Sequence, residues 1–363
     1  MHLLISFSTL CTLITMYTRE LQEKRHTPLE KGKPVQGTWT EPFGEVDLLG
    51  VNRPYPVPLP VPVKDLRIKE WESFTVQNNQ FFFHAWLCNL KYYHSAFVLL
   101  HNKETGEHVE FKKLVPGRGW SLPRSLRNAS VDSRSKGFFF RIHSWLDAKR
   151  ITLDINIRQR RKLAFTAHAT FDFAQFETTP MTVNLLFSEY RNMYAYKAFT
   201  AVRGNVVSGD LNAYFDQNTA SGVFCDVKGY FPYRMKSTWC MAMGFDNTNR
   251  RFGFMIGENQ AKEPFRNNES ALWVDGRLTP LPPVMITQSS TTGSDWTIQD
   301  MEGMVDLVFT PKKPGRFQRN YFVSACDYEY PLGVFNGRLV DVNGDLIEVR
   351  DLWGMGEKLY LRV

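Results

Sequence analysis

The feature that most constrains the fold is a two-residue alternation of apolar and polar side chains. Residues 150–158, RITLDINIR, carry isoleucine or leucine at every second position, and residues 164–173, AFTAHATFDF, continue the alternation with alanine and phenylalanine. Successive side chains of a strand point to opposite faces of a sheet, so each segment is a predicted strand with one buried face. The basic link between them, RQRRK, predicts a hairpin.

Similar segments recur along the rest of the chain. Further predicted strands are QFFFHAWLC, SAFVLLHN, HVEFKKLV, GFFFRIHSW, SGVFCDV, TWCMAMGFD, RRFGFMIGEN, ALWVDGRL, GMVDLVFTP and YFVSACDY. Asn343-Gly344, at the centre of VDVNGDLIEV, predicts a second hairpin, whereas residues 181–190 fit either a strand or a short helix. Because the sequence shows no long amphipathic helix, we predict an all-β fold whose antiparallel sheets close as barrels or stack as sandwiches, with few short helices.

The length of 363 residues is about right for two domains of ordinary size. We expect an N-terminal tail and proline-rich strap over residues 1–64, a first β-barrel-like domain over residues 65–195, and a second over residues 196–363. Within the strap, proline recurs at every second position from Pro54 to Pro62, which disfavours helix and favours extended chain. This segment fits a ligand for a proline-reading domain, or a strap across the body with its valines and leucine buried; we favour the strap.

The charge and the cysteines exclude several classes of protein. The 44 Lys and Arg and 37 Asp and Glu give a net charge of +7 that is spread along the chain, so we expect no nucleic-acid binding. A weak attraction to anionic substrates or membranes is left open. The 5 cysteines are widely spaced, with no Cys-x-x-Cys. This pattern is typical neither of a disulfide scaffold nor of a structural zinc site, and it fits a reducing compartment.

The N-terminus, MHLLISFSTLCTLITM, resembles a signal peptide but has no preceding Lys or Arg and no small-x-small cleavage site. It is also too short to span a bilayer. Because Met16 opens an ordinary polar sequence, we expect residues 1–15 to be an upstream-start artefact or a loose tail rather than an export signal. The expected location is cytoplasmic, without stable membrane insertion.

Familiar catalytic motifs are missing from the sequence. It contains no G-x-x-x-x-G-K-[ST], no G-x-G-x-x-G opening a helix, no H-E-x-x-H and no G-x-S-x-G. We therefore predict no cofactor and no metal. His101 and His108 flank the turn NKETGE and fit metal ligands that meet across a hairpin, or two exposed histidines; we favour the second interpretation.

The best site candidates are carboxylates that lie beside aromatic residues. The segment CDVKGYFPYRMKSTWC (225–240), the two segments GENQ and NNESALWVDGR, and the last segment, RDLWGMGEKLYLRV, each combine an acid with rings or amides. If strand ends converge, three acids could share one cavity mouth and perform general acid–base catalysis, although each also fits a paired surface acid. The candidate catalytic residues are Asp226, Glu269 and Glu357. The candidate ligand-binding residues are Tyr230, Tyr233, Arg234, Trp239, Asn259, Trp273, Trp353 and Arg362.

Several of these segments resemble a family catalogued as domain of unknown function 2804. The similar stretches are CDVKGYFPYRMKSTWC, NNESALWVDGRLTPLPPV, WTIQDMEGMVDLVFTP, YPLGVFNGRL and VRDLWGMGE, with LRIKEWESFTV and FVLLHNKETGE in the first half. The resemblance covers roughly residue 20 to the C-terminus. One departure is that the family commonly ends in Glu-Glu-His followed by Arg-Trp, whereas this chain has Leu359 and Val363 in place of the His and Trp.

The family is in turn similar to calycin-type proteins with two lipocalin-like barrels, among them carotenoid hydratases and cyclases. This resemblance implies two consecutive lipocalin-like β-barrels that enclose a small-molecule ligand. Three functions then fit: a hydratase, isomerase or cyclase that acts on an apolar or polycyclic molecule, a carrier without chemistry, and a carbohydrate-active enzyme with paired carboxylates. A cavity lined with Phe and Met favours the first two functions. The oligomeric state is not predicted.

Overall fold

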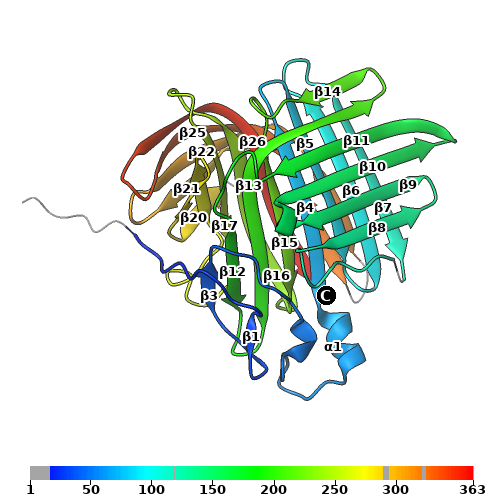
Figure 1. The fold of residues 1–363 in the computed structure, drawn as a ribbon, viewed down its shortest axis with the longest axis vertical. Coiled ribbons are helices and arrows are strands. Elements are labelled where there is room, and N and C mark those ends of the chain that lie inside the picture. The colour runs from blue at the N-terminus through cyan, green and yellow to red at the C-terminus, as the bar shows by residue number, and fades with distance from the viewer. Residues whose placement is uncertain (1–16, 118, 289–293, 321–323, 363) are drawn as a thin grey trace, which may run out of the picture.

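The computed structural model describes residues 17–117, 119–288, 294–320 and 324–362. The predicted tail, residues 1–15, lies outside these residues. The regular secondary structure of the described chain is nearly all antiparallel strand, with one short α-helix, α1 (Val61–Arg67), and 3-10 turns at Leu48–Gly50 and Leu146–Ala148. The prediction of an all-β fold is therefore confirmed, and the strands form two curled half-barrel sheets (Figure 1).

The first sheet has 13 strands in its described part. Its strands are β3 (Gly37–Trp39), β4 (Lys69–Gln77), β5 (Phe81–Asn89), β6 (Tyr93–Asn102), β7 (His108–Pro116), β8 (Ala129–Ser135), β9 (Phe138–Trp145), β10 (Arg150–Gln159), β11 (Lys162–Asp172), β12 (Met181–Leu186), β13 (Asn192–Ser208), β14 (Leu211–Phe215) and β15 (Ser221–Gly229). The main order is β7-β6-β5-β4-β15-β13-β11-β10-β9-β8, with β3, β12 and β14 joined at β13 and its neighbours.

The second sheet has 11 described strands and begins directly after β15. Its strands are β16 (Arg234–Phe245), β17 (Arg251–Glu258), β18 (Ala271–Val274), β19 (Arg277–Pro280), β20 (Val284–Gln288), β21 (Trp296–Asp300), β22 (Val305–Lys313), β23 (Arg316–Asn320), β24 (Ala325–Glu329), β25 (Leu332–Val340) and β26 (Leu346–Arg362). The main order is β19-β18-β17-β16-β26-β25-β22-β21-β20, and β24 joins β23 to β26. A separate ribbon pairs β1 (Leu29–Glu30) with β2 (Lys33–Pro34).

The alternating segments pair as their side-chain pattern requires. β10 and β11 form the predicted hairpin, and Ile155 opposite Ala167 is one of its buried cross-strand pairs. The chain around Asn343-Gly344 joins β25 to β26 as the second predicted hairpin, and residues 181–186 are a strand. The first sheet continues to Gly229, so residue 195, where the sequence placed a domain change, lies inside β13. The sequences of β13 and β15, which are buried on both faces over much of their length, gave no signal of where one sheet ends.

The proline-rich segment differs from its prediction. Val57 and Val61 are 60% and 57% exposed, so the expectation that the valines of the strap are buried is wrong. Helix α1 begins inside the proline run, with Pro62 in its first turn. This is sterically allowed because the first turn of a helix leaves its backbone N–H groups unpaired in any case.

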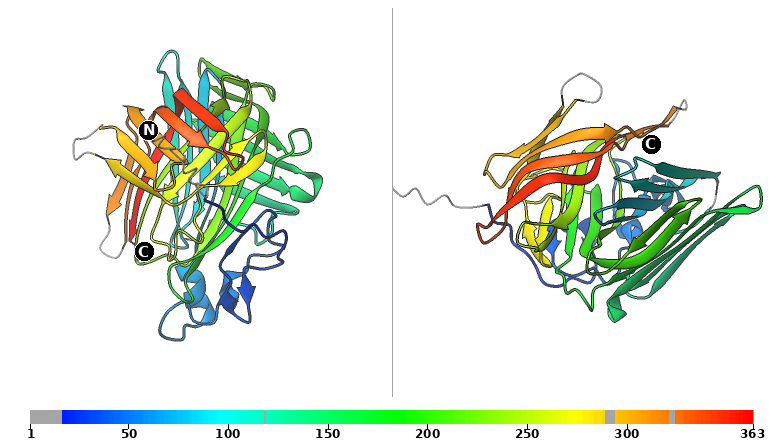
Figure 2. Two further views of the ribbon diagram at one scale, coloured as in Figure 1. Left: turned by 90° about the vertical axis from the view of Figure 1, so that its left-hand side faces the viewer. Right: turned by 90° about the horizontal axis from the view of Figure 1, so that it is seen from above.

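The described residues form three apolar cores. One fills the first half-barrel, where Trp39 and Phe43 of the N-terminal arm pack among its strands, and another fills the second half-barrel. The remaining core lies where the two sheets face each other, and the view from above in Figure 2 shows their facing curved surfaces. Arg251 of β17 crosses this boundary, since its guanidinium donates to Ser221 Oγ at 2.8 Å and to the Gln217 carbonyl at 2.6 Å.

Candidate functional site

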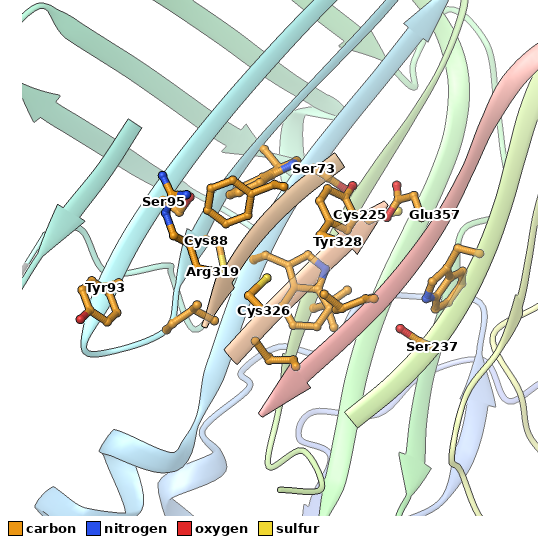
Figure 3. A pocket seen from close by; sticks show the side chains of 18 of the residues that line it. Ser73, Cys88, Tyr93, Ser95, Cys225, Ser237, Arg319, Cys326, Tyr328 and Glu357 are labelled. Carbon is orange, nitrogen blue, oxygen red and sulfur yellow. The ribbon is translucent and has the colours of Figure 1, made fainter. Parts of the chain in front are cut away.

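A cavity of about 680 Å³ lies between the two sheets. Its described walls come from alternate residues of adjacent strands, because every second side chain of a strand faces the same side. The first sheet contributes Trp71 and Ser73 of β4, His84, Trp86 and Cys88 of β5, and Cys225 and Val227 of β15. The second contributes Ser237, Trp239 and Met241 of β16, Cys326 and Tyr328 of β24, and Glu357, Leu359 and Leu361 of β26. Figure 3 shows several of these side chains pointing into the shared space.

The cavity has a buried inner part and an exposed rim. At the inner end the sheets touch, with Cys225 Sγ 3.4 Å from Met255 Sδ and Thr75 Oγ1 3.3 Å from Met241 Sδ. At the outer end the lining reaches exposed residues, among them Tyr92 and Tyr233. The cavity therefore extends from exposed side chains at its rim to a buried part lined by aromatic and sulfur-containing residues.

A buried ion pair crosses the inner part of the cavity. Lys197 Nζ of β13 lies 3.3 Å from a Glu269 carboxylate oxygen and donates to the Glu269 carbonyl at 3.0 Å. Asn259 donates to the other Glu269 oxygen at 2.6 Å. Burial lowers the pKa of Lys197 and raises the pKa of Glu269, while each charge opposes the shift of the other. Because Lys197 belongs to the first sheet and Glu269 precedes β18 of the second, the pair also ties the two sheets together.

Glu357 is the group in the cavity best placed to exchange a proton. It faces the cavity from β26, directly across from Trp239 of β16. Burial raises its pKa to about 7, although a hydrogen bond from Tyr328 and the charge of Lys197 pull in the opposite direction. Burial also raises the pKa of Tyr328 well above its ordinary value, so its hydroxyl remains a donor. Near neutral pH, Glu357 can therefore either give or take a proton.

Two polar side chains face the cavity with unused hydrogen-bonding atoms. His84 pairs its Nδ1 with Thr75 Oγ1 at 2.8 Å, and no partner is found for its buried Nε2 among the described residues. Burial lowers the pKa of His84 to about 3, which keeps the ring neutral. Within the same described part of the chain, the buried Ser237 hydroxyl also lacks a partner. Buried polar atoms are normally paired, so these two atoms are unusual features of the cavity wall.

The indole of Trp239 is held by its neighbours on both sides. Lys197 Nζ lies 3.9 Å from the centre of one of its rings. Gly257, opposite Trp239 on β17, leaves room for the indole, since a Cβ there would stand 2.6 Å from Trp239 Cε3. Glycine at this position therefore lets a large ring lie flat in the cavity wall.

The structure brings together four of the residues that the sequence singled out. Glu269, Glu357, Trp239 and Tyr233 all line the cavity. Tyr233 lies on its exposed rim, whereas Glu269 is buried in its inner part. Asn259 lies behind the wall, where it holds Glu269.

Asp226 lies elsewhere, because its neighbours Cys225 and Val227 take the cavity face of β15. Its carboxylate is buried and ion-paired with Lys228, and Glu72 of β4 lies directly across from it. Burial and then the charge of Asp226 raise the pKa of Glu72 to about 8. The predicted convergence of three acids thus brings Glu269 and Glu357 into one cavity and leaves Asp226 outside it.

The other predicted ligand-binding residues have structural contacts away from the described cavity lining. The Tyr230 hydroxyl donates to the Leu48 carbonyl at 3.2 Å, and the Trp273 indole to the Thr179 carbonyl at 2.9 Å. Trp353 packs 5.3 Å from the ring of His101. Arg234 and Arg362 face each other across β16 and β26 at the outer end of the sheet.

Sequence reasoning missed Lys197, His84 and the walls formed by Trp71, Trp86 and Tyr328. Lys197 carried a usable signal, since it is a lone cation in the apolar run NMYAYKAFTAV, where a charge is expected to be buried and paired. The tryptophans had no such signal because their strands look like any others. Leu359, which stands where the similar family commonly has histidine, also lines the cavity.

The parts of the chain that the structure describes contain neither a cluster of metal-binding side chains nor a helix that could span a membrane. No group of three or more His, Cys, Asp or Glu there could hold a metal ion. His101 and His108 lie opposite each other on β6 and β7, with ring centres 5.7 Å apart. None of the described helices is both long and apolar enough to cross a membrane.

Comparison with known proteins identifies the family. A family model described as "Domain of unknown function (DUF2804)" matches residues 18–362, and the chain belongs to this family. No curated protein matches the sequence.

Solved structures show the same fold at low sequence identity. Two are structures of CghA, each with a TM-score of 0.55 and 10% identity. The one determined with Sch210972 aligns over 81% of this chain and 89% of its own, and the other over 95% and 97%. Kievitone hydratase from Nectria haematococca has a TM-score of 0.51 and 13% identity over 80% of this chain and 88% of its own. The expected two-barrel architecture is thereby confirmed.

Proposed function

We propose that this member of the domain-of-unknown-function 2804 family binds a largely apolar, unsaturated small molecule and protonates it from Glu357. The observation that carries the proposal is a partly buried carboxyl with a pKa of about 7 in a cavity walled by Trp71, Trp86 and Tyr328. A carboxylic acid that is partly neutral at neutral pH is the group needed for general acid catalysis.

The reaction begins with the transfer of the Glu357 proton to one carbon of a carbon–carbon double bond, which leaves a carbocation on the other carbon. Aromatic ring faces attract a cation, and the walls provide several. Trp239 is the ring least available to the carbocation, because the Lys197 ammonium group already lies over it. Water then adds to the cation, and the proton that water loses returns to the Glu357 carboxylate, which restores the acid. Attack by a second double bond in place of water closes a ring and leaves a new carbocation, which then loses a proton to the Glu357 carboxylate, so that a double bond forms and the acid is restored.

Polar side chains orient the molecule without taking part in the proton transfer. His84 Nε2 and the Ser237 hydroxyl are available to a carbonyl or hydroxyl group of the substrate, and the Tyr328 hydroxyl holds the Glu357 carboxyl in place. The name of kievitone hydratase agrees with this class of reaction, and the shared fold supports the architecture alone.

A carrier function is the second candidate, and Leu359 favours it. This side chain lines the cavity at the position where the similar family commonly has histidine. An apolar residue there removes a proton-exchanging group and leaves a more uniform apolar wall. The carrier would bind the same class of molecule and release it unchanged.

The test separates binding from chemistry. The bound molecule is first extracted from protein purified from its own host and identified by native mass spectrometry. Wild type and Glu357→Gln are then compared for its dissociation constant and its turnover. The proposal predicts similar affinities and a fall in turnover of about 10²–10⁴-fold. Equal turnover by the two proteins would overturn the role of Glu357, and no turnover by either would establish the carrier.

A further inference from the structure

Helix α1 leaves apolar side chains in solvent. It has 7 residues and none of them is buried, although Val61, Val63 and Leu66 are apolar. Val57, in the proline-rich segment before it, is 60% exposed. Single exposed apolar residues are ordinary, but a continuous group of them marks an interaction surface.

The helix that carries this group adjoins the rim of the cavity. Asp65 of α1 is ion-paired with Lys91 at 3.0 Å, which fixes the helix beside the β5–β6 turn. Lys69, just after the helix, lies 5.3 Å from the centre of the Tyr92 ring. Arg67 and Tyr92 themselves line the cavity. Figure 1 shows α1 at the same end of the molecule as the C-terminal end of the chain.

The rim combines rings with positive charge. Tyr92 and Tyr233 are each 48% exposed and line the cavity. Arg67 and Arg319 line it as well, and Arg234 is exposed directly beside Tyr233. We call this surface the mouth face. Its apolar members are Val57, Val61, Val63, Leu66, Tyr92 and Tyr233, and its basic members are Arg67, Arg234 and Arg319.

We propose that the mouth face docks on the surface of an anionic phospholipid bilayer, from which an apolar molecule enters the cavity. Three features favour a bilayer over a protein partner. Tyrosines and short apolar side chains insert at the boundary between headgroups and acyl chains. Arginines around them attract anionic lipid headgroups, in line with the net charge of +7. The cavity also opens within this face, so a molecule dissolved in the bilayer reaches it without crossing water.

The mouth face acts independently of the chemistry at Glu357. It rests on the exposed rim and helix, while the proton transfer rests on the inner end of the cavity. Glu357→Gln is therefore expected to bind vesicles as wild type does. Loss of vesicle binding together with retained turnover would remove only the docking proposal.

The experiment is flotation of the full chain with vesicles of phosphatidylcholine, with and without phosphatidylglycerol. We expect wild type to float with the anionic vesicles, and less of it as salt is added. Val61→Asp/Leu66→Asp should lower the partition coefficient at least about tenfold, because both side chains must leave water. Arg234→Gln should lower it about fivefold, the factor expected for one basic residue near an anionic surface.

The matched control is Leu163→Asp. Leu163 is 57% exposed and belongs to the β10–β11 hairpin, which contributes no side chain to the described cavity lining. We expect its flotation to equal that of wild type, and unchanged urea unfolding of each variant confirms its fold. Failure of wild type to float overturns the proposal, as does an equal loss in Leu163→Asp. The docking proposal is also overturned if Val61→Asp/Leu66→Asp floats with the vesicles as wild type does but no longer binds a protein that wild type binds.

Discussion

Replacement of Glu357 by glutamine should stabilise the protein at high pH and have little effect at low pH. The folded protein raises the pKa of Glu357 from 4.5 to about 7, so it favours the neutral carboxyl more than the unfolded chain does. The stabilisation that this provides is complete below about pH 4.5 and is lost as the pH rises through about 7. Glutamine keeps the shape and an acceptor for the Tyr328 hydroxyl, and it has no proton to lose.

The size of the effect follows from the pKa shift. Each pKa unit corresponds to about 1.36 kcal/mol, so full ionisation of Glu357 opposes folding by roughly 3 kcal/mol. Between about pH 5 and about pH 8, the stability of Glu357→Gln relative to wild type should therefore rise by about 2.5 kcal/mol.

The assay is equilibrium urea unfolding of both proteins at a series of pH values. The difference between the two proteins is informative because Glu72, whose pKa is also raised, titrates equally in both and cancels. Glu348→Gln, on an exposed part of the same strand, is the control and should show no such trend. A difference between Glu357→Gln and wild type that stays flat with pH would refute the reasoning that Glu357 is held neutral by burial.

Two further predictions concern the inner part of the cavity. Lys197→Met leaves the Glu269 carboxylate buried without its cation and should lower the free energy of unfolding by about 3–5 kcal/mol. The double variant Lys197→Met/Glu269→Gln should restore most of this loss. Urea unfolding measures both changes, and a loss below about 1 kcal/mol in Lys197→Met would contradict the prediction. Gly257→Ala places a methyl group 2.6 Å from Trp239 Cε3, so it should displace the indole and weaken the binding of an apolar fluorescent probe. Unchanged probe affinity and unchanged tryptophan fluorescence would count against that geometry.

The local sequence pattern was enough to predict the individual strands, but it did not predict where the first sheet ends and the second begins. The alternation in β10 and β11 reflects one buried face of an antiparallel sheet, which is a property of each strand alone. β15 and residues 192–202 of β13 are buried on both faces, so their sequences show no alternation and no change of sheet. The prediction that the valines of the proline run are buried was wrong for a different reason. These valines are apolar, but no other described segment packs over them.

The candidate site was predicted only in part, because the local sequence does not show which residues of two different sheets lie close together. Glu269 and Glu357 were found from their aromatic neighbours in sequence. Asp226 had the same kind of neighbours, and the face of the strand it occupies excludes it from the cavity. Lys197 reaches Glu269 across 72 positions of the chain, a distance in sequence at which no spacing rule operates.

The most direct test of proton transfer from Glu357 is to run the reaction of the extracted ligand in deuterium oxide and to measure deuterium on carbon by mass spectrometry. Exchange in deuterium oxide places deuterium on the Glu357 carboxyl, so we expect one carbon–deuterium bond per turnover in wild type and none above background in Glu357→Gln. Product that carries no deuterium on carbon, or equal labelling by the two proteins, would contradict proton transfer from Glu357.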